Sequence, residues 1–123
     1  MFRFMVGIGL LISTTTGARI AECIPASDQD VAGIRLSLDS FFADAPAVRF
    51  KDVCISQSNP FRKTKRGFCG LVNAKNQFGA YTGYTPFMYL EGSKSAGVVT
   101  NTDAPGASYC TMCAGDPICA KYK

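Results

Sequence analysis

The chain contains no histidine and no tryptophan among its 123 residues. Without histidine it has no Ser-His or Cys-His nucleophile pair and no imidazole base that titrates near neutral pH. The acidic residues are spread singly, apart from Asp28 and Asp30, whose position at an expected helix start is explained by capping. A net charge of only +4 does not support nucleic-acid binding by bulk attraction. These absences argue against an enzyme and against a nucleic-acid partner.

One apolar run is long enough to stand out, and it lies at the N-terminus. Residues 4–12 follow a short basic start, and a small polar stretch then ends at Ala18. This layout predicts a secretory signal peptide over residues 1–18, and its apolar part is too short to anchor the chain across a bilayer. We therefore expect an exported protein, periplasmic or extracellular, without a transmembrane anchor after cleavage. An uncleaved amphipathic helix is the alternative.

The remaining residues, 19–123, are expected to form one small domain that contains all six cysteines. An even number of cysteines in a small exported chain indicates a disulfide framework, in which each bond contributes about 2–4 kcal/mol. Cys23 follows the charged Glu22, where a lipoprotein needs a small residue, so a disulfide is favoured over lipidation. The cysteines other than Cys54 and Cys69 have no assigned pairing: Cys23, Cys110, Cys113 and Cys119.

The expected fold class is α+β: one N-terminal helix packed on a small antiparallel sheet of three or four strands, with a disulfide-tied C-terminal tail. Ser27 and Asp30 form a capping-box pattern, and apolar residues then recur at helical spacing, which predicts a helix over 28–43. Strands are expected over 48–55 and 68–73, with an extended segment over 85–90. Residues 91–108 have the composition of a flexible linker, and residues 109–123 form the Cys-rich tail.

Pairing of the two expected strands as a hairpin sets Cys54 opposite Cys69. Opposed side chains in such a pair are close enough for a disulfide, so we predict a Cys54–Cys69 bond. The spacing Cys110-x-x-Cys113 also occurs in thiol-exchange proteins and zinc sites. Turn residues flank it, and only three cysteines and no histidine are near, so structural disulfides are favoured. No metal and no cofactor are predicted.

The stretch from Cys69 to Phe87 reads Cys-Gly-Leu-Val-Asn-Ala-Lys-Asn-Gln-Phe-Gly-Ala-Tyr-Thr-Gly-Tyr-Thr-Pro-Phe. It resembles a family of small exported bacterial proteins of unknown function that carry the motif Cys-Gly-x-Val-Asn-x-Lys-Asn-x-Phe-Gly-x-Tyr-x-Gly. Residues 44–53 look like that family's segment after its first helix, so the resemblance covers residues 28–90. It implies a compact helix-plus-sheet domain, and it assigns no activity and nothing to the tail.

Two groups of residues are candidates for binding. Amphipathic Tyr rings with neighbouring amides suit an interface, although Asn, Gly and aromatic residues also serve turns and packing. The basic segment 62–66 suits an anionic contact, such as lipopolysaccharide, phospholipid head groups or an acidic partner, although it also suits a solvated hairpin tip. We expect the two groups to lie partly exposed and near each other: Asn73, Lys75, Asn76, Tyr81 and Tyr84, with Arg62, Lys63, Lys65 and Arg66.

The function expected from these features is that of a non-enzymatic exported protein that binds a macromolecule or an anionic envelope component. One alternative is a thiol-disulfide redox protein that uses Cys110 and Cys113. A second alternative is a structural accessory subunit of an envelope assembly. The sequence leaves open the partner, the oligomeric state and the complete disulfide pattern.

Overall fold

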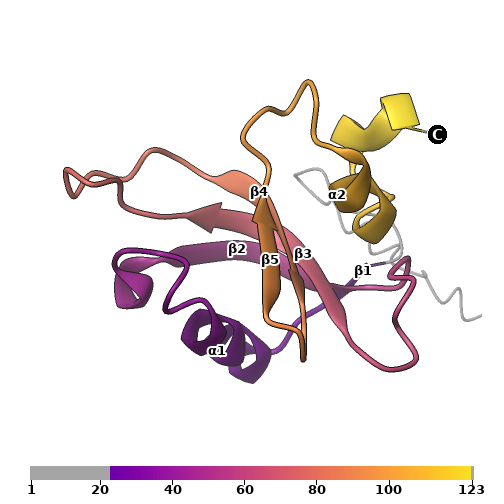
Figure 1. Ribbon diagram of the computed structural model, residues 1–123, viewed down its shortest axis with the longest axis horizontal. Helices are drawn as coiled ribbons and strands as arrows, with labels where there is room; N and C mark the ends of the chain where they lie inside the picture. The colour runs from indigo at the N-terminus through magenta and orange to yellow at the C-terminus, as the bar shows by residue number, and fades with distance from the viewer. Residues whose placement is uncertain (1–22, 123) are drawn as a thin grey trace, which may run out of the picture.

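The computed structural model describes residues 23–122, and the predicted signal peptide lies outside this part of the chain. Five strands form one antiparallel sheet in the order β1-β2-β3-β4-β5 (Figure 1). The strands are β1 (Cys23–Pro25), β2 (Arg49–Ser56), β3 (Gly67–Asn73), β4 (Thr85–Leu90) and β5 (Ser95–Val98). The helical segments are α1 (Asp28–Ser37), the 3-10 turn η1 (Ala45–Ala47), α2 (Ala107–Met112) and the 3-10 segment η2 (Pro117–Tyr122).

The predicted fold, one helix packed on three or four strands, is wrong. The sheet has five strands, because β1 extends it beside β2 and β5 extends it beside β4. The segment 91–108, expected to be a flexible linker, includes β5, so that interpretation is wrong for residues 95–98. Both added strands are short and take their conformation from the strand beside them rather than from an alternating pattern of their own.

Helix α1 begins where the sequence predicts and ends early. The hydroxyl of Ser27 accepts a hydrogen bond from the Asp30 N–H, and the Asp30 carboxylate accepts one from the Ser27 N–H, which confirms the capping box. The helix ends at Ser37 rather than near residue 43. Residues 37–40 are Ser-Leu-Asp-Ser, and Ser and Asp form helices weakly because their side chains compete for backbone hydrogen bonds.

Strands β2 and β3 pair antiparallel, and from Cys54 onward they keep the register that the sequence predicts, with Cys54 opposite Cys69. The register shifts between Lys51 and Cys54, where Asp52 has a positive φ of 53°. Such a bulge re-aims the side chains that follow it along the strand. Before the bulge the pairing is offset by one residue from the predicted register, so Arg49 and Lys51 lie opposite Asn73 and Leu71 of β3.

The sheet carries a separate hydrophobic cluster on each face, because side chains alternate between faces along a strand. Phe68 and Val72 of β3 belong to the cluster that includes Ile34 of α1. Cys69 belongs to the other cluster, which includes Tyr109 of α2. Figure 1 shows α1 and α2 on opposite sides of the sheet. Helix α2 and η2 therefore cover the second face only near one end of β3.

Three disulfides tie the described chain together: Cys23–Cys54, Cys69–Cys113 and Cys110–Cys119. The predicted Cys54–Cys69 bond is therefore wrong although the two residues are opposed. Each cysteine is bonded to a residue outside the β2–β3 hairpin. Cys54 is bonded to Cys23 of β1, which pairs with β2, and Cys69 is bonded to Cys113, which follows α2. Disulfides form and persist in oxidising compartments.

Candidate functional site

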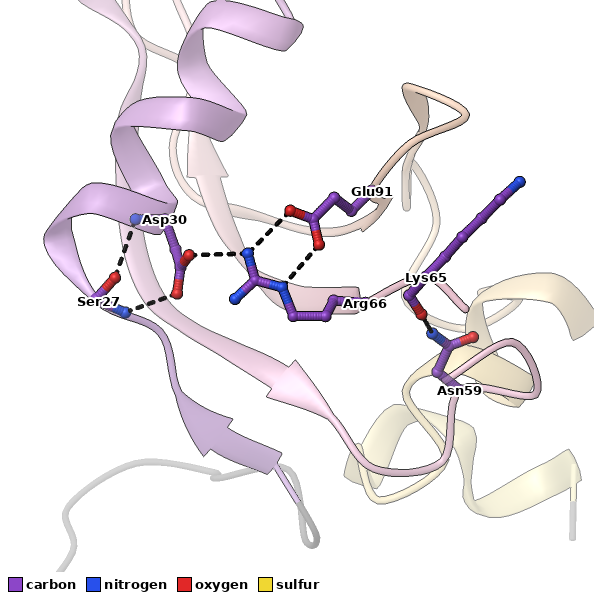
Figure 2. Close-up of polar contacts among 6 residues, drawn as sticks. All are labelled: Ser27, Asp30, Asn59, Lys65, Arg66 and Glu91. Atoms are coloured by element: carbon purple, nitrogen blue, oxygen red, sulfur yellow. Dashed lines mark hydrogen bonds and ion pairs between the residues drawn. The ribbon is translucent and has the colours of Figure 1, made fainter. Parts of the chain in front are cut away.

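The basic segment 62–66 lies in the connection between β2 and β3, and its last residue has a structural role (Figure 2). The Arg66 guanidinium donates two hydrogen bonds to the Glu91 carboxylate, at 2.7 and 2.9 Å. It also forms an ion pair with Asp30 at 3.1 Å. Arg66 therefore joins the start of α1 to the turn after β4, and both contacts engage its charge within the fold.

The charges of this cluster stabilise one another. The hydrogen bonds from Arg66 hold the pKa of Glu91 below its ordinary value. Burial alone would raise the pKa of Asp30, but hydrogen bonds from Ser27 and Arg66 bring it below its ordinary value. The contact with Glu91, followed by that with Asp30, raises the pKa of Arg66. The arrangement favours the ionised form of all three groups.

The rest of the loop is shaped by buried and backbone contacts. Asn59, 2% exposed, donates from its side-chain amide to the Lys65 carbonyl at 2.7 Å (Figure 2). Arg62 donates to the Gln57 carbonyl at 2.9 Å. Lys63 and Lys65 are exposed. Four cations of this loop were predicted to bind. The charged groups of Arg62 and Arg66 form described contacts, and those of Lys63 and Lys65 do not.

A second group of charges lies at the other end of β3, and we call it the cation–tyrosine surface. The Arg49 guanidinium lies 4.1 Å from the centre of the Tyr81 ring, and the Lys75 ammonium lies 5.6 Å from it. The Lys51 ammonium lies 5.7 Å from the Tyr84 ring centre. All three cations are exposed. The members of this surface are Arg49, Lys51, Lys75, Tyr81 and Tyr84.

Strand alternation and local hydrogen bonds position this surface. Arg49 and Lys51 are two residues apart on β2, so their side chains leave the same face of the sheet. Tyr81 is half-buried and donates its hydroxyl proton to the Ala47 carbonyl at 2.7 Å. An isolated bridge pairs Lys75 with Tyr81 at the base of the β3–β4 connection. The two tyrosines are thus held with cations beside them.

The two predicted asparagines form hydrogen bonds that support the β3–β4 connection. Asn73 is buried, and its side-chain oxygen accepts a hydrogen bond from the Gly83 N–H at 3.1 Å. Asn76 accepts hydrogen bonds from the N–H groups of Phe78 and Ala80, at 2.9 and 3.1 Å. Both side chains therefore form turn contacts, and of the two only Asn76 is exposed.

The expectation that the basic segment and the tyrosines lie together is wrong. Segment 62–66 precedes β3 and the tyrosine segment follows it, so the two lie at opposite ends of that strand, as Figure 1 shows. Sequence reasoning also missed Arg49 and Lys51. Their signal was present, because they occupy the outward positions of an alternating strand, but nothing local indicated which tyrosines would lie beside them.

The Cys-x-x-Cys cysteines do not pair with each other. Cys110 is bonded to Cys119 and Cys113 to Cys69, and each is buried. A redox dithiol needs its two cysteines to pair, so this geometry does not favour the thiol-exchange alternative. Residues 23–122 contain no group of three or more His, Cys, Asp or Glu arranged to hold a metal ion. Within the same residues no helix has the length and apolar character needed to cross a membrane.

Comparisons with protein-family models, curated proteins and solved structures found no match to this chain. The resemblance of residues 28–90 to a family of small exported bacterial proteins stays a prediction.

Proposed function

We propose that this is a non-enzymatic exported protein that binds an anionic envelope partner through the cation–tyrosine surface. The predicted signal peptide and the three disulfides support export. The periplasm and the extracellular space are both consistent with these features.

The observation that carries the proposal is the grouping of three exposed cations against two tyrosine rings. Among residues 23–120, whose side chains the structure describes, no carboxylate forms an ion pair with Arg49, Lys51 or Lys75. Two tyrosines lie beside these cations, and Tyr combines an apolar ring with a polar tip, as interfaces favour. Exposed cations beside amphipathic rings form a surface complementary to an anionic partner.

The test uses a soluble anionic probe, fluorescein-labelled dextran sulfate, and a variant in which Arg49, Lys51 and Lys75 are replaced by serine. Three exposed contacts at about 0.5 kcal/mol each correspond to about a tenfold loss of affinity. The loss should shrink as salt is added, because exposed charges are screened beyond about 10 Å at 0.1 M ionic strength. Fluorescence anisotropy at two salt concentrations measures both effects.

The matched control removes the same number of charges elsewhere, by serine at the exposed residues Lys63, Lys65 and Lys94. This variant should bind the probe almost as well as the unmodified protein. Equal losses in the two variants would mean that binding follows total charge and not this surface. An unmodified protein that does not bind the probe would refute the proposal.

A further inference from the structure

Phe78 is the most exposed large apolar residue of the described chain, with 84% of its surface accessible. It lies at the tip of the β3–β4 connection, where a local turn directs it away from the core. The Asn76 N–H donates to the Ala80 carbonyl at 2.8 Å, and the Gly79 N–H donates to the Asn76 carbonyl at 3.0 Å. Gly79 adopts a positive φ of 79°, which glycine does without strain. The turn thus fixes the backbone that carries the Phe78 ring.

An exposed apolar residue by itself is ordinary in proteins, and what distinguishes Phe78 is its surroundings. Lys75 and Tyr81 form the base of the same connection, and the rest of the cation–tyrosine surface lies next to them. Figure 1 shows this connection extending along the long axis of the molecule, beyond the sheet and away from both α1 and α2. Phe78 therefore belongs to the turn at the tip of this connection, and Lys75 and Tyr81 belong to its base.

We propose that this end of the molecule docks on an anionic membrane surface, with Phe78 inserted into the lipid interface and the cations against lipid phosphates. This inference rests on the proposed function and names the class of its partner. A soluble polyanion offers charges for Arg49, Lys51 and Lys75 but no apolar region for Phe78. A lipid surface offers both: phosphates for the cations and an apolar interior for the ring of Phe78. Tyr rings are also enriched at the level of lipid head groups.

The opposite end of the sheet offers a weaker form of the same combination. Phe61 is 54% exposed and is followed by the basic segment 62–66. Phe61 also lines a surface cavity of about 400 Å³ together with Leu90 and Met112, and close to half of its surface is covered by the protein. Arg66 is engaged by Asp30 and Glu91. Phe61 is therefore the matched control for Phe78.

The absence of tryptophan permits a direct test with the disulfide-bonded protein, because a single introduced Trp reports only its own environment. We would compare Phe78→Trp with Phe61→Trp on vesicles of phosphatidylglycerol and phosphatidylcholine in equal parts. Emission from Phe78→Trp should shift to shorter wavelength and be quenched by lipids brominated in the acyl chain. Emission from Phe61→Trp should stay at its value in buffer.

Partition to the same vesicles, measured by sedimentation, gives the size of each contribution. Phe78→Ser should weaken partition about tenfold, since it removes the insertion of one aromatic ring, whereas Phe61→Ser should not weaken it. Each cation replaced in the cation–tyrosine surface should weaken it about fivefold at low salt. Binding of Phe78→Ser to dextran sulfate should stay unchanged.

The outcomes separate this inference from the proposed function. Unchanged vesicle partition of Phe78→Ser, or dextran sulfate binding without any vesicle partition, overturns the membrane inference and leaves the proposed function standing with an acidic soluble partner. A blue shift of Phe61→Trp in place of Phe78→Trp overturns it in favour of the opposite end. Failure to bind either probe overturns both proposals.

Discussion

Replacement of Cys69 and Cys113 together by alanine tests how the chain after β5 is held on the sheet. Cys69 lies on the central strand β3, and Cys113 follows α2 directly. Both are 0% exposed, and their bond closes a loop with a sequence separation of 44. It is the longest loop of the three, because the other separations are 31 and 9.

The expected loss of stability follows from the entropy that each loop removes from the unfolded chain. In the chain-entropy model a loop of this length contributes about 4 kcal/mol, whereas the short loop between Cys110 and Cys119 contributes about 2.6 kcal/mol. The longer bond should therefore stabilise the fold by about 1.4 kcal/mol more than the shorter one. Folding free energies are commonly about 5–15 kcal/mol, so the loss is a large share of the total.

The assay is urea unfolding followed by far-ultraviolet circular dichroism, with linear extrapolation to water. The Cys69→Ala/Cys113→Ala variant should show the larger decrease in unfolding free energy, and Cys110→Ala/Cys119→Ala the smaller one. Equal losses, or a loss below about 1 kcal/mol for the long loop, would refute the reasoning, because loop length would then not decide the contribution.

Two further predictions concern packing and pH. Gly70→Ala should destabilise the fold by about 1–3 kcal/mol in urea unfolding, because a Cβ there would lie 3.0 Å from both the Phe87 ring and the Val53 Cα; Gly33→Ala in α1, where nothing lies within 4 Å, should not destabilise it. Arg66→Gln should flatten the fall in stability on acidification. Because folding lowers the pKa values of Asp30 and Glu91, the two carboxylates stabilise the fold at pH above their ordinary pKa values of 3.8 and 4.5. This stability is lost as the pH falls through the pKa values of the folded state. Parallel pH curves for the variant and the unmodified protein would contradict that account.

The parts of the fold that follow from sequence are those specified by neighbours along the chain. The start of α1 follows from the Ser27 and Asp30 capping box, which needs only four consecutive residues. The register of β2 with β3 follows from alternation on each side of one connection. Both features are local. The structure confirms the capping box, and it confirms the register from Cys54 onward.

The disulfide pattern and the edge strands depend on distant segments. Alternation places Cys54 and Cys69 on one face, but it does not show that their disulfide partners are Cys23 and Cys113. Strand β1 is three residues long and ends in proline, and β5 reads Ser-Ala-Gly-Val. Neither sequence has the alternating pattern that identifies a strand. The conformation of each is determined by its pairing with β2 or β4.

One error about the candidate site was avoidable with geometry available from the sequence. A strand rises about 3.3 Å per residue, so the seven residues of β3 separate its two ends by about 20 Å. The basic segment precedes that strand and the tyrosines follow it, which already places them far apart. The contacts of Arg49 with Tyr81 and of Lys51 with Tyr84 were not accessible in this way, since they depend on how the β3–β4 connection folds back.

The layout of the second face separates the residues that stabilise the protein from those that we propose bind. Near Cys69 this face is covered by α2 and two disulfides, whereas Arg49 and Lys51 lie at its open end. Charge changes at the open end should therefore alter binding and leave the unfolding free energy within about 0.5 kcal/mol of its original value. Tyr81 is the exception, because its hydroxyl also holds the Ala47 carbonyl. Variants of the three cations, rather than of Tyr81, are for this reason the ones that report on binding alone.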